Sequence, residues 1–153
     1  MEENLKQLLK DLKTINFDEK LNEPQNEQVL KLAFIGDTIF DMFTRDYLIR
    51  KYSRKIKISE MHTKNTELVC ARSQSMIADK LIDDFLYEDE IDFFKHARNA
   101  HSHSKAKNSS IVEYRKATGI EALLGLMFYR DENRLIQILS KISTIIDDLK
   151  NAD

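Results

Sequence analysis

The segment AFIGDTIFDMF, residues 33–43, decides the fold because nearly all of its side chains are apolar. It belongs to a longer helical pattern, residues 27–51, whose first half is apolar on most faces, so we expect this helix at the centre of a helical core. One carboxylate, Asp37, stands near the middle of the segment, directly after Gly36. A buried charge is costly unless it is paired, so Asp37 requires a partner.

The composition indicates a single helical domain. The chain has 153 residues, of which 42% are apolar and 33% charged, and it contains only three glycines and one proline. This length suits one domain with a real core, and the scarcity of glycine and proline favours helices over strands and turns. We therefore predict an all-α fold, with an N-terminal helix and connector in residues 1–26 and the main domain in residues 27–150.

Apolar periodicity and capping signals predict the remaining helices. We expect Ser59 to cap a helix over residues 60–79, and a further short helix to end near Tyr87. Ser110, followed three residues later by Glu113, resembles a capping box at the start of a helix. The predicted helices cover residues 1–14, 27–51, 60–79, 88–99, 111–130 and 132–149, and residues 100–110 form the clearest internal loop.

Several features limit the classes of protein to which the chain can belong. The formal net charge of −2 argues against a protein that coats nucleic acid through bulk positive charge. The single cysteine, Cys70, cannot form an internal disulfide, which fits a reducing compartment. The charged N-terminus has no signal-peptide core, and no apolar run approaches the roughly 20 residues of a membrane span. We expect a soluble, cytoplasmic protein.

A second acid, Glu121, lies in an equally apolar helical segment, GIEALLGLMF, residues 119–128. Gly125 follows one turn later, and small residues let another helix, a metal or a substrate approach closely. Each acid can bond a backbone group or a buried Arg or Lys, or the two can share a divalent cation. Mg²⁺, with Mn²⁺ as a substitute, needs only one or two protein carboxylates together with substrate phosphates. Asp41, one turn after Asp37, is either a further group near such a site or an ion-paired surface residue.

The two apolar segments, LAFIGDTIFDMF at residues 32–43 and ATGIEALLGLMF at residues 117–128, resemble the two catalytic helices of the ribonuclease III family. Further blocks resemble its short bacterial subfamily, Mini-ribonuclease III, in the same order and at similar spacing. These blocks are HTKNTELVCARSQS (62–75), ARNAHSHSKAKNSSIVEYRKAT (97–118) and EALLG (121–125). The resemblance covers roughly residues 27–140.

This resemblance implies an all-helical, homodimeric nuclease that uses Mg²⁺ to cleave both strands of duplex RNA, leaving 5′-phosphate and 3′-hydroxyl ends. Asp37 and Glu121 match the catalytic, metal-binding positions of the family. The implied substrate is precursor ribosomal RNA of the large subunit (23S), with a ribosomal protein as a candidate partner that presents the RNA. We expect no double-stranded-RNA-binding domain, so the RNA contacts come from the catalytic domain itself.

Three positions depart from the pattern of other family members. Ala33 and Leu30 stand where those members have glutamates, and Thr118 stands where they have an aspartate. The carboxylate cluster is therefore thinner, which leaves open whether one metal or two bind. The thinner cluster also motivates a second hypothesis, a ribonuclease III-like module that binds RNA or a ribosomal partner without cutting.

Candidate RNA contacts gather in a stretch without acids, residues 93–112, and in the block at residues 62–75. Duplex RNA is read mostly through phosphates and 2′-hydroxyls, which calls for basic and small polar side chains. Solvated surface chemistry is the alternative, and it is the favoured interpretation of the basic run at residues 45–57. Two histidines in the stretch are a poor match to zinc-ligand spacing. The candidate RNA-binding residues are Arg98, Asn99, His101, His103, Lys105, Lys107, Asn108, Arg115, His62, Lys64 and Arg72, with Gln74 as a further donor.

Overall fold

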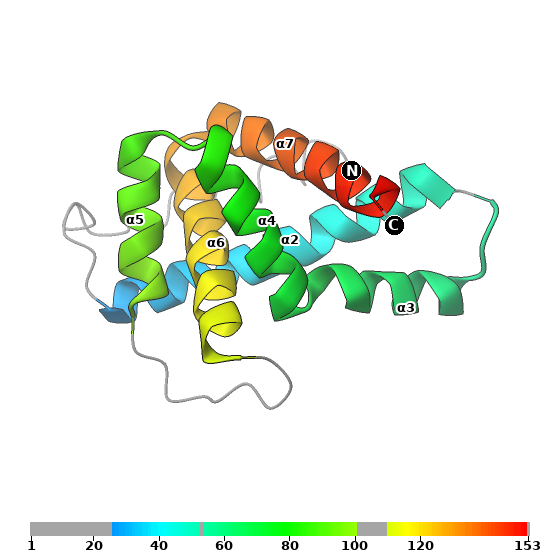
Figure 1. The fold of residues 1–153 in the computed structure, drawn as a ribbon, viewed down its shortest axis with the longest axis horizontal. Helices are drawn as coiled ribbons and strands as arrows, with labels where there is room; N and C mark the ends of the chain where they lie inside the picture. Colours follow the sequence, from blue (N-terminus) through cyan, green and yellow to red (C-terminus); the bar gives the residue numbers. More distant parts are fainter. Residues whose placement is uncertain (1–25, 53, 101–109, 153) are drawn as a thin grey trace, which may run out of the picture.

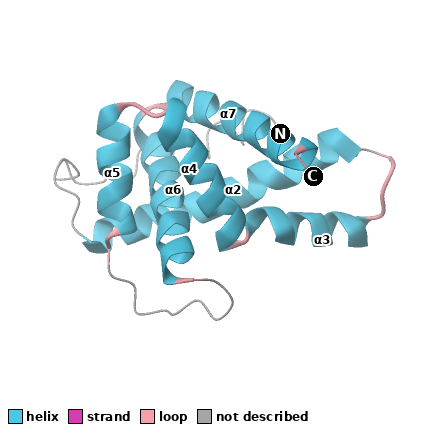
Figure 2. Cartoon of the chain, in the orientation of Figure 1, coloured by secondary structure: helices cyan, strands magenta, loops and turns pink. Residues whose placement is uncertain are grey.

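The computed structural model describes residues 26–52, 54–100 and 110–152, and these ranges contain six helices and no strand (Figure 2). The predicted all-α fold is therefore confirmed for the described part of the chain, whereas the helix predicted at residues 1–14 lies outside it. The helices are α2 (Asn26–Tyr52), α3 (Ile58–Val69), α4 (Ala71–Asp84), α5 (Glu88–Arg98), α6 (Ile111–Arg130) and α7 (Glu132–Asn151). None of these six helices is long and apolar enough to cross a membrane.

Helix α6 is the central element and packs against α2, α4, α5 and α7 (Figure 1). Its most extensive contact is with α2, which crosses behind it in the view of Figure 1. Residues 117–126 of α6 are buried except Glu121, which is only partly covered. Phe40, Leu123 and Ile138 bring α2, α6 and α7 together in the largest apolar cluster. The two apolar segments that define the sequence thus form the middle of the core.

The capping box predicted before α6 is confirmed. The backbone N–H of Glu113 donates to the Ser110 hydroxyl at 3.1 Å, and the backbone N–H of Ser110 donates to the Glu113 carboxylate at 3.3 Å. These two bonds satisfy donors that the start of a helix leaves without partners. Helix α6 accordingly begins at Ile111, the residue expected from the sequence.

The prediction of one helix over residues 60–79, capped by Ser59, is wrong. The chain forms two helices there, α3 and α4, with Cys70 in an extended conformation between them. Ser59 lies inside α3, and the N-cap position is occupied by Lys57. The apolar pattern continues across this corner, which is why the sequence alone did not reveal it.

Two side chains of α4 stabilise the corner between α3 and α4. The Ser73 hydroxyl donates to the carbonyl oxygen of Glu67 at 2.5 Å, and the Gln74 amide donates to the carbonyl oxygen of Val69 at 3.0 Å. Carbonyl groups in the last turn of a helix have no intrahelical donor. Polar residues early in α4 therefore supply what the end of α3 lacks.

Two glycines allow the backbones of α2 and α6 to touch. A β-carbon at Gly36 would lie 1.7 Å from the carbonyl oxygen of Glu121, and one at Gly125 would lie 2.1 Å from the carbonyl oxygen of Leu32. Main-chain atoms inside a close-packed core cannot move aside as the end of a flexible side chain can. The expectation that small residues permit a close approach is therefore confirmed. The contact lies next to Asp37, which directly follows Gly36.

A buried ion pair joins α5 to α7. Arg134 donates to both carboxylate oxygens of Glu90, at 2.8 and 2.7 Å, and the two side chains are only 8% and 4% exposed. The same guanidinium donates to the carbonyl oxygen of Phe85 at 3.2 Å and lies against the Tyr87 ring. Burial raises the pKa of Glu90, but hydrogen bonds from Arg134 and from the Tyr87 backbone outweigh it and hold this pKa below its ordinary value.

Candidate active site

Asp37 of α2 and Glu121 of α6 lie together where these helices cross at Gly36. Burial, reinforced by the negative charge of Asp37, raises the pKa of Glu121 to about 8, although a hydrogen bond from Gln74 acts to lower it. Asp37 is exposed on one side; the partial burial of its other side and the negative charge of Asp41 raise its pKa as well. Among the described residues, neither acid forms an ion pair with Lys, Arg or His.

Gln74 of α4 is the third residue of this group. We expected it to be a surface donor for RNA, but the packing of α4 on α6 leaves it only 2% exposed, so that expectation is wrong. Its amide donates to the Val69 carbonyl oxygen, and its side chain hydrogen-bonds Glu121. Its own oxygen, Oε1, is buried without a hydrogen-bond partner in the described part of the chain. Gln74 therefore connects the α3–α4 corner to the Glu121 carboxylate.

Asp41, one turn after Asp37, is held by other groups. Its carboxylate accepts a hydrogen bond from Asn65 Nδ2 at 2.7 Å and another from Arg45 Nε at 3.0 Å. Asn65 accepts in turn from the Thr44 hydroxyl at 2.6 Å. Because both oxygens of Asp41 already have donors, the structure favours an ion-paired surface residue over a group of the acid pair. Asp41 acts on Asp37 through its charge.

The acid pair has the chemistry of a site for a hard divalent cation. Two neighbouring carboxyls with raised pKa values are stabilised in their charged form by a nearby positive charge. Mg²⁺ retains several waters and needs only one or two carboxylates, so Asp37 and Glu121 fit it as protein ligands. The buried, unpaired Oε1 of Gln74 is an acceptor that a hydrated ion would satisfy. Over residues 26–52, 54–100 and 110–152, no group of three or more His, Cys, Asp and Glu side chains could hold a metal, so no closed protein cage is formed there.

Several predicted RNA contacts lie on exposed surface at the helix ends. Arg72 is exposed in the first turn of α4. Arg115 is exposed on α6, about 120° around the helix from Glu121. Arg98 and Asn99 lie at the end of α5, where Arg98 Nε donates to the Asn99 side-chain oxygen at 3.3 Å. The predictions for His101, His103, Lys105, Lys107 and Asn108 fall outside the described residues.

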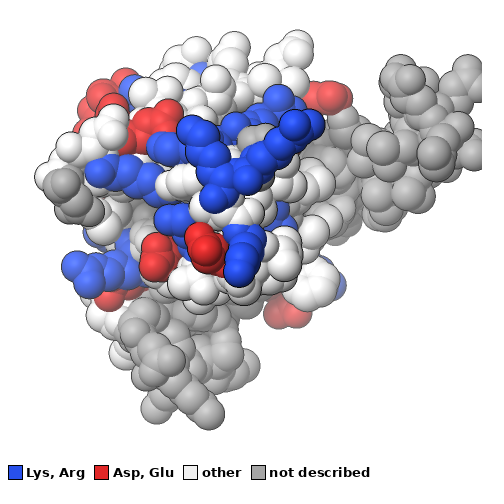
Figure 3. Space-filling view, turned by 90° about the vertical axis from the view of Figure 1, so that its right-hand side faces the viewer, with Lys and Arg blue, Asp and Glu red and all other residues white. Residues whose placement is uncertain are grey.

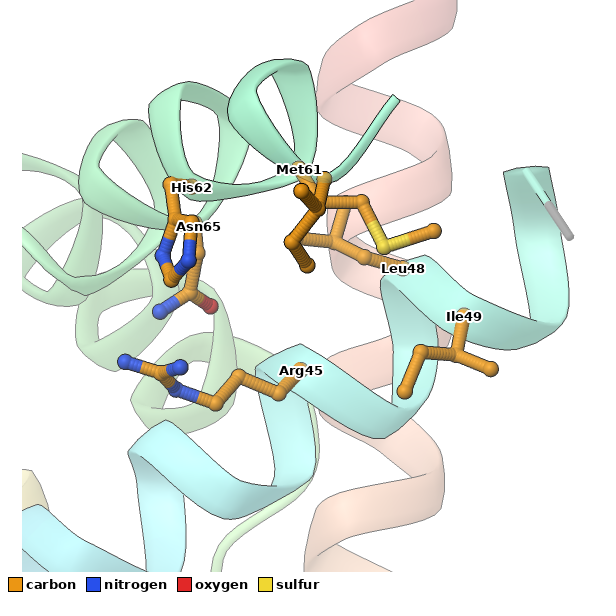
Figure 4. A pocket seen from close by; sticks show the side chains of 7 residues that line it. Arg45, Leu48, Ile49, Met61, His62 and Asn65 are labelled. Atoms are coloured by element: carbon orange, nitrogen blue, oxygen red, sulfur yellow. The ribbon is translucent and has the colours of Figure 1, made fainter. Parts of the chain in front are cut away.

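His62 and Lys64 of α3 lie in surroundings different from those of the acid pair. His62 lines a cavity of about 120 Å³ between α2 and α3, together with Met61 and other residues of the two helices (Figure 4). The Lys64 ammonium lies 4.8 Å from the centre of the Tyr52 ring. Tyr52 is 15 residues after Asp37 on the same helix, a separation of about 22 Å at 1.5 Å per residue. The structure therefore does not bring Lys64 to the carboxylates.

Sequence reasoning missed the structural roles of Asn65 and Gln74. Gln74 was expected on the surface and Asn65 had no predicted role, whereas both side chains are buried. A weak signal was present, because Asn65 lies three residues before the buried Leu68 and Gln74 lies three residues before the buried Ile77. A polar residue in register with the apolar face of a helix is usually hydrogen-bonded inside the protein, as these two are.

Comparison with known proteins agrees with this geometry. Residues 30–132 match the family model of the Ribonuclease III domain, and this range includes both Asp37 and Glu121. Mini-ribonuclease 3 of Staphylococcus aureus is 36% identical over 121 residues, which cover 78% of this chain and 89% of the relative. Mini-ribonuclease 3 of Brevibacillus brevis is 33% identical over 131 residues, which cover 85% of this chain and 96% of the relative.

The three-dimensional comparison gives a consistent result. A crystal structure of a protein from Fusobacterium nucleatum matches with a TM-score of 0.69 and 26% sequence identity. The match covers 87% of this chain and 99% of that protein. The solved structure supports the fold, and the sequence similarity and the matched domain show the family. The chain therefore belongs to the ribonuclease III family and, within this family of endoribonucleases, to the Mini-ribonuclease 3 group.

Proposed function

We propose that this protein is a divalent-metal-dependent endoribonuclease that cleaves both strands of duplex RNA at the Asp37–Glu121 pair. The observation that carries the proposal is the pair itself: two acids, held together by a backbone contact, have raised pKa values and no cationic partner among the described residues. Such a pair is unfavourable for folding on its own, because neighbouring like charges repel and burial disfavours ionisation. The names of the Mini-ribonuclease 3 relatives support the reaction class.

In this proposal, Asp37 and Glu121 hold one Mg²⁺, or Mn²⁺ in its place, through carboxylate oxygens. A cation of this kind, when bound, activates water and stabilises negative charge on a phosphodiester. Glu121 has to release its proton before it can act as a ligand, so its raised pKa makes binding stronger as the pH rises. Gln74 orients the Glu121 carboxylate, and the contact at Gly36 fixes the separation of the two helices.

The expected products carry 5′-phosphate and 3′-hydroxyl ends. Arg72, Arg98 and Arg115 supply positive charge for the phosphates of a duplex, which dominate affinity for nucleic acid. The sequence resemblance to Mini-ribonuclease III supports a large-subunit ribosomal RNA precursor as substrate, a ribosomal protein as a presenting partner and a cytoplasmic location. Incubation of the precursor with the purified protein, followed by mapping of the cut ends, tests the substrate directly.

Cleavage of duplex RNA by an Asp37→Asn variant tests the mechanism. The variant should lose cleavage in the presence of Mg²⁺ while it retains its helical content and its affinity for RNA, because only the metal-binding charge is removed. Asp46→Asn is the matched control: it removes one acid from an exposed ion pair with Arg50 on the same helix and should cut at the wild-type rate. Wild-type cleavage by Asp37→Asn would overturn the mechanism.

A homodimer is part of the same proposal, and α2 offers the surface for it. Phe34, Met42 and Ile49 are 83%, 67% and 56% exposed, and their spacings of eight and seven residues place them on one face of the helix. Ile49 also lines the cavity between α2 and α3, whose other lining residues are Leu48, Ile58 and Met61 together with the polar Arg45, His62 and Asn65 (Figure 4). Exposed apolar side chains that share one helix face are candidates for an interaction site. A twofold axis through α2 would bring two acid pairs into one particle, one for each RNA strand.

The molar mass in solution, measured by light scattering, tests the dimer. Phe34→Asp should convert a dimer into a monomer, because it places a charge in the apolar contact. Ile136→Asp, at a position on α7 that is 58% exposed, is the matched control and should leave the dimer intact. A wild-type protein that is monomeric at all concentrations would contradict this part of the proposal.

A non-catalytic RNA-binding module is the second candidate function, and one observation favours it. Among the described residues, two carboxylates meet at the crossing, and Ala33, Leu30 and Thr118 stand where the sequence resemblance implies acids in other family members. Duplex RNA incubated with the protein in Mg²⁺ and then in EDTA separates the two functions. Shortening of the RNA only in Mg²⁺ supports the enzyme, whereas a gel shift with intact RNA under both conditions supports the module.

A further inference from the structure

A basic surface lies at the end of the molecule where α2 ends, α3 begins and α7 ends (Figure 1). Figure 3 views this end directly, and blue side chains gather across its middle. The sequence run at residues 45–57 supplies only part of this charge, since further lysines come from α3 and α7. We name it the end surface; it consists of Arg50, Lys51, Arg54, Lys55, Lys57, Lys64 and Lys150.

Three lysines of the end surface converge on one tyrosine. The ammonium groups of Lys64 and Lys150 lie 4.8 and 5.3 Å from the centre of the Tyr52 ring, and Lys150 Nζ donates to the Tyr52 hydroxyl oxygen at 3.4 Å. Lys51 is near enough for its charge to act on the same tyrosine. These residues come from three helices that are far apart in the sequence, so the fold itself collects the positive charge. Ammonium groups brought together in this way repel one another unless an anion lies between them.

Within the described part of the chain, acids pair with two members of the end surface. Arg50 pairs with Asp46 at 2.7 Å, and Lys51 pairs with Asp147 at 3.2 Å. The other five cations have no ion pair with any described residue. This end of the molecule therefore keeps an excess of positive charge, although the whole chain carries a formal net charge of −2.

We propose that the end surface binds the phosphate backbone of duplex RNA on the flank of the cleavage site. This inference rests on the proposed function, because it assigns a second contact to the same substrate. Tyr52 lies about 22 Å along α2 from Asp37, a distance that a rigid duplex crosses without bending. Lysine is a compact point charge suited to phosphate, and it is depleted in the cores of protein–protein interfaces, so the composition favours RNA over an acidic protein.

The experiment compares two triple variants with the wild type. Arg54→Ala/Lys55→Ala/Lys57→Ala removes three exposed charges of the end surface that have no ion pair with a described residue. The control, Lys80→Ala/Arg130→Ala/Lys141→Ala, removes the same charge from α4, α6 and α7 outside the end surface. Binding to duplexes of about 16 base pairs, the span of a double-stranded-RNA-binding domain, and of about twice that length is measured in EDTA over a range of salt concentrations. Thermal unfolding confirms that both variants fold.

The end-surface variant should bind the longer duplex about tenfold more weakly near 0.15 M salt, with a salt dependence shallower by about one unit per lost phosphate contact. The control variant should behave like the wild type.

If the end-surface variant keeps the wild-type affinity and salt dependence, the inference is wrong, and the proposed function stands as long as the wild type binds and cuts. Binding of polyglutamate that this variant loses, with unchanged RNA binding, would assign the surface to an acidic protein and overturn the inference. A wild type that neither binds nor cuts duplex RNA would overturn the proposed function itself.

Discussion

Two glutamates at helix–helix contacts, Glu90 in the first turn of α5 and Glu121 in the middle of α6, have pKa values shifted in opposite directions. Glu90 is buried against Arg134, which donates to both of its oxygens, and its pKa is held below the ordinary value. Glu121 has another acid, Asp37, as its charged neighbour, and burial with that charge raises its pKa to about 8. Both side chains lie at helix–helix contacts, so burial alone does not separate them.

The charged neighbour of a carboxylate distinguishes an acid that stabilises the fold from an acid that is available to bind a ligand. A buried carboxylate that is satisfied by a guanidinium completes a contact between helices, and nothing further needs to bind it. A buried carboxylate beside a second carboxylate stays unfavourable until a cation arrives. Perturbed acids in such settings are candidates for function. By this criterion Glu90 stabilises the contact between α5 and α7, and Glu121 is available to bind a cation. Each of these roles can be tested by experiment.

The largest expected effect is on cleavage, from Glu121→Gln. This change removes the charge that would hold the cation and keeps the shape of the side chain, so cleavage of duplex RNA in Mg²⁺ should fall below detection. The free energy of unfolding in EDTA at about pH 8 should stay equal or rise, because an amide carries no desolvated charge. Rates from gel-resolved time courses and urea unfolding curves provide the two measurements. A strongly destabilised variant would mean that Glu121 is a structural acid like Glu90.

The second effect is on stability, from Glu90→Gln. It leaves the Arg134 guanidinium buried without its charged partner, which costs about 3–5 kcal/mol of unfolding free energy. Urea unfolding monitored by circular dichroism measures this loss. The double variant Glu90→Leu/Arg134→Met should recover most of the stability, since buried ion pairs can be replaced by apolar groups of similar size. Equal losses in the single and double variants would contradict the comparison.

The third effect is the pH dependence of stability in EDTA, which should have opposite signs for the two acids. The pKa of Glu121 rises from 4.5 to about 8 on folding, so the native state holds a proton that the unfolded chain has released. Its stabilisation is full below pH 4.5 and is lost as the pH rises toward about 8, at about 1.4 kcal/mol per unit. The lowered pKa of Glu90 gives stability above pH 4.5 that is lost on acidification.

The difference between the urea unfolding of the wild type and of Glu121→Gln, from about pH 5.5 to about pH 8.5, isolates the Glu121 contribution, because ordinary carboxyls do not titrate there and the other groups are common to both proteins. The wild type should lose stability with increasing pH in this window, and Glu121→Gln should lose less. Saturating Mg²⁺ should offset the loss, since a ligand that binds only the folded state stabilises it. A wild-type curve identical to that of Glu121→Gln would count against the raised pKa.

The smallest effect is expected from Asp41→Asn. Asp41 is bonded to Asn65 and Arg45 near the surface, and such exposed ion pairs contribute about 0–1 kcal/mol. Loss of its charge should bring the pKa of Asp37 closer to the ordinary value, which an NMR titration of the carboxyl carbon measures. Cleavage should change by less than about threefold. A loss as complete as that of Glu121→Gln would make Asp41 a third member of the acid pair.

The sequence was sufficient to predict the parts of the fold that depend on local patterns. The all-α class, the helix that begins after Ser110 and the long helix around Asp37 follow from apolar periodicity and capping residues, which act over one or two turns. The proximity of Asp37 and Glu121 was one of the alternatives that the two apolar segments left open, and the resemblance to the ribonuclease III family favoured it.

The remaining features depend on contacts between residues that are distant in the sequence. Glu90 and Arg134 are 44 residues apart, and Glu90 lies in a run of acids that reads as exposed surface. The corner at Cys70 depends on the Gln74 side chain reaching back to the end of α3, while the apolar pattern continues through it. The collection of lysines around Tyr52 likewise requires three helix ends to meet. Periodicity cannot encode these pairings, because they are properties of the packed chain.

The backbone contact at Gly36 and Gly125 has a consequence for how the site tolerates sequence drift. Where helices are separated by side chains, every substitution at their interface changes the spacing between them. Here main-chain atoms meet directly, so the spacing of the two acids is set by the thickness of two peptide backbones, which is the same in every protein. Apolar neighbours in the core can be exchanged over evolutionary time without resetting that distance. The two glycines therefore fix the distance between the helices that carry the acids, and a larger residue at either position would collide with the backbone of the other helix.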